Sequence, residues 1–140
     1  VLDHNFFVDR ILLFLGTKRK LKKEEKDYYR KPFLNKKSRL PTYVFPNEIP
    51  INGKPEDVHT MVKNNHEWLQ KTTIPKLLLW VKPGVLVKKH NLKVMRTKYP
   101  SFGDAYLGKS SNFPKESHYV QEDFPHEIGK AITNWLPHLN

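Results

Sequence analysis

The sequence predicts an α/β fold in which a helical N-terminal segment is followed by two parallel strands and their helices. A continuous apolar run at residues 76–81, KLLLWV, is closed by the turn dipeptide Pro83-Gly84, as in a strand buried on both faces of a parallel sheet. Apolar residues at helical spacing precede this run over residues 56–71 and recur over residues 125–136. Helices that alternate with strands in this way indicate parallel pairing.

The chain has 140 residues, enough for one small domain with a modest core, and its formal net charge is +11. Residues 18–39 hold eleven Lys and Arg against three acidic residues, and so carry eight of the eleven net positive charges. Such a basic patch can attract nucleic acid or an anionic membrane. Because it lacks regular aromatic interleaving, we interpret it as a solvated surface and expect no specific nucleic acid and no membrane as partner.

The apolar residues 6–15 are interrupted by Asp9 and Arg10 and are far short of the roughly 20 residues that span a membrane. No basic lead-in with a small-residue cleavage site precedes them. We therefore predict a soluble, cytoplasmic protein. The chain has no cysteine, and its seven histidines show no metal-ligand spacing, so no metal site is predicted.

The first 55 residues predict three segments. Residues 1–16 are strongly apolar and of helical character, and residues 20–31 form a short charged helix that Pro32 ends. Residues 32–55 contain five prolines separated by large apolar side chains, a composition that predicts an ordered extended loop and not a flexible linker.

The next elements carry the sheet. Residues 56–71 predict a helix with acidic residues in its first turn and a core face of Val58, Met61, Val62, Asn65 and Leu69. After the strand at residues 76–81, residues 88–98 predict a helix that faces inward through Leu92 and Met95, and residues 104–107 predict a second strand. A parallel strand needs neighbouring strands on both edges and helices on both faces, and two strands cannot supply them. We therefore expect the elements that complete the sheet to lie outside this sequence.

A polar loop carrying His118 leads into the last helix. Asp123 is predicted as its N-cap, and Pro125 suits its first turn. Its apolar face recurs at helical spacing and consists of Ile128, Ala131, Ile132, Trp135 and Leu136. Functional groups of open α/β sheets gather beyond the C-terminal ends of the strands, which makes His118 a candidate catalytic residue.

Residues 118–129, HYVQEDFPHEIG, resemble the catalytic-histidine motif of haloalkane dehalogenases, members of the α/β-hydrolase superfamily. Five further segments resemble that family in the same order: residues 29–34, 45–51 with Gly53 and Pro55, 75–80, 83–86 and 132–139. The resemblance covers nearly the whole chain but only the C-terminal half of the family fold. It implies that residues 1–71 are the C-terminal part of a helical cap domain with a proline-rich loop, and residues 72–140 the C-terminal part of the main domain.

The resemblance also implies a mechanism. His118 would be the general base that activates a water molecule, and this water would hydrolyse an alkyl-enzyme ester formed when an aspartate displaces halide from carbon. A histidine suits this step because its usual pKa, near 6.5, lets it accept a proton at neutral pH. No cofactor is expected. By position in the matching motifs, an apolar pocket for a small halogenated hydrocarbon would be lined or bordered by Phe7, Ile11, Pro46, Ile49, Val85, Leu86 and Tyr119.

The nucleophile and the relay acid lie outside this sequence. There is no G-x-nucleophile-x-G turn, and the family's halide-binding tryptophan and asparagine are absent with it. After Trp80 the chain reads VKPG, without the aspartate that some relatives carry there, which agrees with the branch whose acid is a glutamate further upstream. We therefore predict that this chain is inactive alone and that its partners are the missing N-terminal half, water and the substrate.

Three alternatives stay open. A coelenterazine luciferase-like monooxygenase resembles the dehalogenases in this same half, and an epoxide hydrolase would use cap tyrosines such as Tyr28, Tyr29 or Tyr43 as acids. A non-catalytic, truncated pseudoenzyme would instead use the basic patch at residues 18–39 to bind an acidic partner. Residues 108–117, which precede His118, are longer than the family's glycine-rich connection and lack its Pro-Gly.

Overall fold

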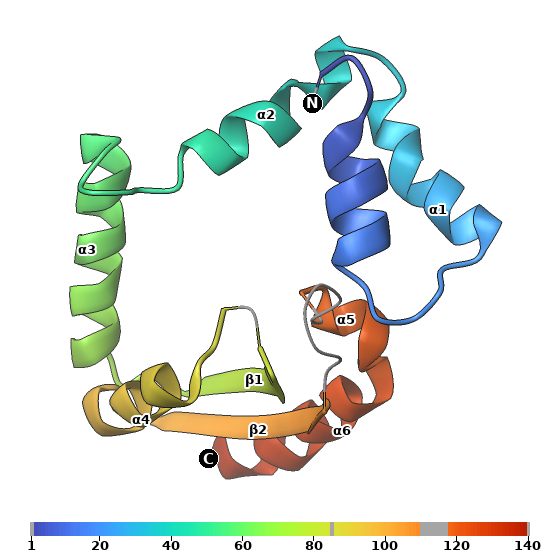
Figure 1. Ribbon diagram of the computed structural model, residues 1–140. Coiled ribbons are helices and arrows are strands. Elements are labelled where there is room, and N and C mark those ends of the chain that lie inside the picture. Colours follow the sequence, from blue (N-terminus) through green and yellow to red (C-terminus); the bar gives the residue numbers. More distant parts are fainter. Residues whose placement is uncertain (1, 85, 110–117, 140) are drawn as a thin grey trace. The chain divides into compact units, whose positions relative to one another are not determined.

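The structure, a computed structural model, describes residues 2–84, 86–109 and 118–139 (Figure 1). The chain divides into two compact units. The first consists of Val1–Leu15 and Lys20–Glu67, and the second of Gly16–Arg19 and Trp68–Asn140.

The first unit is built from helices. In chain order they are the π-helix η1 (Phe7–Leu15), α1 (Lys23–Arg30), the 3-10 helices η2 (Lys31–Phe33) and η3 (Lys37–Arg39), and α2 (Leu40–Asn47). The helix α3 (Glu56–Lys71) follows and runs into the second unit. Of the predicted helices, that at residues 56–71 is confirmed over its full length, and those at residues 1–16 and 20–31 are confirmed over Phe7–Leu15 and Lys23–Arg30.

The core of the first unit lies between η1 and α1. Val8, Leu13 and Leu21 are buried there, and Phe7, Leu12, Tyr29 and Phe33 pack against them. A π-helix pairs residues five apart, and Val8 and Leu13 have that spacing, so both reach the core. The apolar pattern predicted a helix, but it did not distinguish a π-helix from an α-helix.

The prediction of an extended loop over residues 32–55 is wrong for much of its length, because η2, η3 and α2 make most of residues 31–47 helical. The prolines are compatible with these helices because of where they lie. Pro32 and Pro41 stand at the starts of η2 and α2, where an amide N–H would have no helical partner. Pro46 is inside α2 but only one residue from its end.

The helix α3 has the predicted bounds, but its predicted core face is not a core face within the described residues. No residue of α3 is buried, and Met61 is 55% exposed. Val58 and Leu69 are half-buried, whereas Val62 and Asn65 are exposed. The helical pattern was correct, and among the described residues no element covers this apolar side.

The second unit is built around two strands, β1 (Lys76–Lys82) and β2 (Phe102–Lys109). They pair in parallel, with Lys76 opposite Phe102 and an irregularity between Trp80 and Val81, which confirms the predicted pairing. The remaining helices of this unit are α4 (Lys89–Lys98), α5 (Val120–Asp123), α6 (Pro125–Trp135) and the 3-10 helix η4 (Leu136–Leu139).

The helices α4 and α6 lie on opposite faces of this two-stranded sheet. Arg96 of α4 binds Asp104 on one face of β2, whereas Trp135 of α6 approaches the adjacent Gly103. Successive strand residues point to opposite faces, so the two helices flank the sheet. On the α6 side, Val81, Leu107 and Phe124 form a buried cluster against which Leu79, Val120, Ile128 and Ala131 pack.

The predicted N-cap of the last helix is wrong. The residue before Pro125 is Phe124, which caps α6 without a side-chain hydrogen bond. Asp123 instead accepts hydrogen bonds from the backbone N–H groups of Lys18 and Arg19. A carboxylate that is already bound by a distant segment is not available to the helix start.

Among the described residues, no helix combines the length and the apolar character needed to cross a membrane.

Asp104 connects β2 to α4 and to β1. Its carboxylate accepts hydrogen bonds from Arg96 Nε at 2.7 Å, from Arg96 Nη2 at 2.8 Å and from Trp80 Nε1 at 2.9 Å. The side chain of Asp104 is only 12% exposed. The hydrogen bonds from Arg96, and to a lesser extent that from Trp80, lower the pKa of Asp104 below its usual value of 3.8, against the opposing effect of burial.

Replacing Asp104 with asparagine is expected to lower the free energy of unfolding at pH 7 by about 1 kcal/mol, since hydrogen bonds to a charged group are lost and Arg96 is partly solvated. Because the folded-state pKa is lowered, this stabilisation is present above the unfolded-state pKa and disappears as the pH falls through the folded-state value. Urea unfolding at pH 7 and near pH 3 measures this difference. Asp57→Asn, at an exposed position, is the control, and an equal effect of Asp104→Asn at both pH values contradicts the prediction.

Candidate functional site

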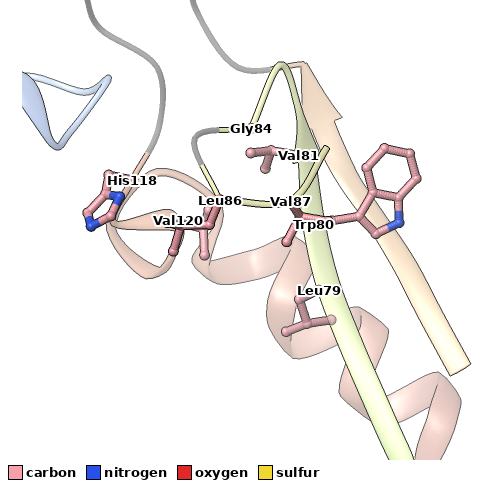
Figure 2. Close-up of a pocket in the computed structure, with 8 residues that line it drawn as sticks. All are labelled: Leu79, Trp80, Val81, Gly84, Leu86, Val87, His118 and Val120. Atoms are coloured by element: carbon pink, nitrogen blue, oxygen red, sulfur yellow. The ribbon is translucent and has the colours of Figure 1, made fainter. Parts of the chain in front are cut away.

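His118 lies two residues before α5, in the part of the chain that follows the C-terminal end of β2. It borders an open pocket of about 120 Å³ in the second unit. Figure 2 shows the residues that line this pocket, which are Leu79, Trp80, Val81, Gly84, Leu86, Val87, His118 and Val120. They come from β1, from the turn after it and from the start of α5.

The pocket is apolar apart from His118. Leu79, Val81, Leu86 and Val120 present only aliphatic side chains, and the indole N–H of Trp80 is held by Asp104. His118 is the one titratable side chain among the described lining residues. An apolar pocket with a single proton acceptor at its edge can hold an apolar ligand and accept a proton from a small polar molecule beside it.

The backbone of His118 is fixed more firmly than its ring. The N–H groups of His118 and Tyr119 both donate to the carbonyl oxygen of Gly16, at 3.1 and 3.0 Å. The imidazole is exposed and packs edge-on against the Tyr119 ring, with 5.0 Å between ring centroids. Burial raises the pKa of the Tyr119 hydroxyl, so this tyrosine stays protonated at neutral pH.

Three of the seven predicted pocket residues line a pocket, and they divide between two separate pockets. Leu86 lines the His118 pocket, whereas Phe7 and Pro46 line a separate apolar pocket within the first unit, together with Phe33, Pro41, Thr42 and Phe45. Ile11 and Ile49 line neither pocket, and Ile49 is exposed.

Tyr119 is the neighbour of His118 but is not among the residues that line its pocket, and Val85 lies outside the described residues. That all seven predicted residues share one substrate pocket therefore stays a prediction.

Sequence reasoning missed several lining residues, including Leu79, Val81 and Val120. A signal for the first two was present, since they alternate along the predicted strand and alternate strand residues share a face. Val120 carried no such signal, because only the packing of α5 against β1 brings it to the pocket.

Comparison with known proteins finds haloalkane dehalogenases as relatives of this chain. A haloalkane dehalogenase from Mesorhizobium japonicum is 34% identical over 139 residues, which cover 99% of this chain and 43% of that enzyme. One from Sphingobium indicum is 35% identical over 140 residues, covering 99% of this chain and 44% of the relative. The chain is homologous to the C-terminal half of the haloalkane dehalogenases. No protein-family model matches it.

Solved dehalogenase structures agree with the sequence relationship. The DbeA-M1 loop variant of the haloalkane dehalogenase from Bradyrhizobium elkanii matches with a TM-score of 0.89 at 35% identity, over 99% of this chain and 44% of its own. The dehalogenase DatA from Agrobacterium tumefaciens C58 matches with a TM-score of 0.83 at 26% identity, over 97% of this chain and 44% of its own. The fold is therefore the C-terminal portion of an α/β-hydrolase.

The chain thus spans less than half the length of the dehalogenases that it matches. In this dehalogenase-like segment, no carboxylate is among the described residues that line the His118 pocket. Nor is any group of three His, Asp or Glu within the described ranges placed to hold a metal ion.

Several members of the basic patch of this dehalogenase-like segment, residues 18–39, have structural contacts. Lys23 pairs with Asp27, Lys36 with Asp3, and Arg30 with both Asp9 and Asp27. The guanidinium of Arg39 donates to four backbone carbonyls, those of Leu2, Asp3, Phe33 and Leu34. Several of these positive charges are therefore engaged in ion pairs and hydrogen bonds within the first unit.

Proposed function

We propose that this chain is the C-terminal half of a hydrolase that cleaves carbon–halogen bonds, with His118 as its general base. The observation that carries the proposal is the placement of His118 at the edge of an apolar pocket beyond the sheet, in a chain homologous to haloalkane dehalogenases. The nucleophilic aspartate and the relay acid belong to the N-terminal half of the same fold.

The reaction has two steps. In the first, a carboxylate oxygen of the aspartate attacks the halogenated carbon, a C–O bond forms, and the halide leaves with the electrons of the C–halogen bond. In the second, His118 accepts a proton from water while the water oxygen attacks the ester carbonyl carbon. Collapse of the tetrahedral intermediate expels the alkoxide, which takes the proton from His118 and leaves as an alcohol. The carboxylic acid that remains loses its proton to solvent, which regenerates the aspartate. Neither step requires a cofactor.

The apolar lining supports a small apolar molecule as the substrate. Leu79, Val81, Leu86 and Val120 offer no hydrogen bonds from their side chains, so they favour a small halogenated hydrocarbon over a polar molecule. Phe7, Ile11, Pro46, Ile49, Val85 and Tyr119 are proposed to complete or border the same pocket in the whole enzyme.

The exposed apolar surfaces support the proposal that another part of the same fold works with this chain. Met61, Val62 and Trp68 of α3 are all about half exposed within this chain. A sheet of two parallel strands is too small to be stable alone, since parallel strands are normally buried on both faces. We therefore propose that the N-terminal half covers these surfaces.

The full-length gene product is expected to be roughly twice the mass of this chain, with a G-x-D-x-G turn upstream, because the relatives are more than twice as long. It should release halide from small haloalkanes, whereas residues 1–140 alone should release none. Intact-mass measurement and a halide assay on both proteins test this. Light emission with coelenterazine, or epoxide opening without halide release, would identify a different reaction on the same fold and refute the proposal.

A further inference from the structure

The four residues Gly16–Arg19, here called the strap, follow η1 in the connection to α1 but belong to the second unit. Gly16 and Thr17 are buried, and Thr17 is only 4% exposed. The strap is about 100 positions away from His118 in the sequence, and no motif pointed to it. Its hydrogen bonds reach residues 118–123 and the end of β2.

The strap holds the chain on both sides of residues 110–117. On the C-terminal side of these residues, the Gly16 carbonyl oxygen accepts hydrogen bonds from the N–H groups of His118 and Tyr119. Before them, the Lys18 ammonium donates to the carbonyl of Lys109, the last residue of β2, at 3.2 Å. Lys109 and His118, which flank this segment in the sequence, are therefore both hydrogen-bonded to the strap.

Two charged side chains hold the strap in turn. Both carboxylate oxygens of Asp123 accept a hydrogen bond from the backbone N–H of Lys18 at 2.9 Å. Oδ1 also accepts one from the backbone N–H of Arg19 at 2.9 Å. The Arg19 guanidinium donates to the carbonyl oxygen of Glu122 at 2.7 Å and to its carboxylate at 2.5 Å. Hydrogen bonds to ionised groups are about twice as strong as neutral ones.

Neither Asp123 nor Arg19 lines the His118 pocket. We infer that Asp123 and Arg19 are positioning residues, which fix the strap so that the Gly16 carbonyl holds His118 in place for its reaction with water. This inference rests on the proposed function of His118. The physical reason is that a misplacement of about 1 Å at a catalytic group can reduce a rate by about 100-fold.

The test uses the full-length protein with Asp123→Ala, Asp123→Asn and, as a control, Gln121→Ala at an exposed neighbouring position. Steady-state halide release should fall about 10- to 100-fold in Asp123→Ala. The first turnover should still release one halide per active site, since the halide leaves before His118 acts. Asparagine should restore part of the rate, because it keeps an oxygen equivalent to Oδ1, which accepts both strap N–H groups.

Amide hydrogen exchange provides a readout that does not depend on activity. In Asp123→Ala, and likewise in Arg19→Ala, the amides of His118 and Tyr119 should exchange faster, because their shared acceptor is no longer fixed. Gln121→Ala and Lys20→Ala should leave their exchange unchanged.

Unchanged exchange and unchanged turnover in Asp123→Ala would overturn the inference. It would also be overturned if the halide burst and the steady-state rate fell in the same proportion, since that result reports loss of folded protein. If the wild type releases no halide, the proposed function fails, but the exchange rates still decide whether Asp123 holds the His118 backbone.

Discussion

Replacing His118 with alanine in the full-length protein is expected to stop steady-state halide release while leaving one burst of halide per active site. In the proposed reaction the alkylation step does not use His118, whereas hydrolysis of the ester uses it as the general base. Loss of a positioned general base lowers a rate by about 10²- to 10⁴-fold. Rapid-mix halide detection measures the burst, and intact-mass spectrometry should show the protein heavier by one alkyl group.

His126→Ala is the matched control, because His126 is exposed in the first turn of α6 and borders no part of the His118 pocket. It should turn over at the wild-type rate. Full turnover by His118→Ala would exclude this residue as the base. Loss of the burst together with the steady-state rate would show that His118 is needed before or during halide displacement, contrary to the two-step assignment.

Replacing Phe124 with alanine is expected to lower the free energy of unfolding by about 3–5 kcal/mol, the usual range for a large aromatic side chain removed from a core. Phe124 is 8% exposed and packs with Val81 and Leu107 at the centre of the second unit. It also lies between β2 and the start of α6, so its loss should loosen the segment that follows His118. Urea unfolding of the full-length protein measures the effect.

The neighbouring Gly108 offers a second variant at the same place. A Cβ atom there would lie 2.8 Å from Phe124 Cε1, and the backbone has a φ of +150°. Gly108→Ala should therefore also destabilise the protein, by about 1–3 kcal/mol. Tyr28→Ala, at a side chain that is 77% exposed, is the control for aromatic truncation. Equal effects of Phe124→Ala and Tyr28→Ala would contradict the assigned core.

Local patterns predicted most of the elements. The acidic first turn and apolar spacing gave α3 its bounds, and the run KLLLWV gave β1. The same reasoning failed for residues 31–47, because it counted prolines without considering that Pro32 and Pro41 could stand in first turns. It also placed Asp123 as an N-cap, since an acidic residue before Pro125 has that appearance in sequence alone.

The part of the candidate site that lies in one continuous motif could be predicted from the sequence. The part that is assembled from distant segments of the chain could not. The sequence around His118 indicated a catalytic histidine, and the structure places that residue at an apolar pocket. The role of Gly16 had no signal, because its carbonyl meets the amide of His118 across about 100 residues of chain. The sequence also predicted both Leu86 and Ile49 beside one pocket, although only Leu86 lines the His118 pocket.

By itself, the sequence determined most of the helices, the two parallel strands and the resemblance to haloalkane dehalogenases, because these follow from the spacing of apolar residues and from motifs read in order. Only the tertiary structure decided what Asp123 binds, which residues line the His118 pocket and what fixes the backbone before α5. Spacing along a chain specifies which side of an element is apolar, whereas hydrogen bonds between distant segments depend on where the folded chain brings their donors and acceptors together.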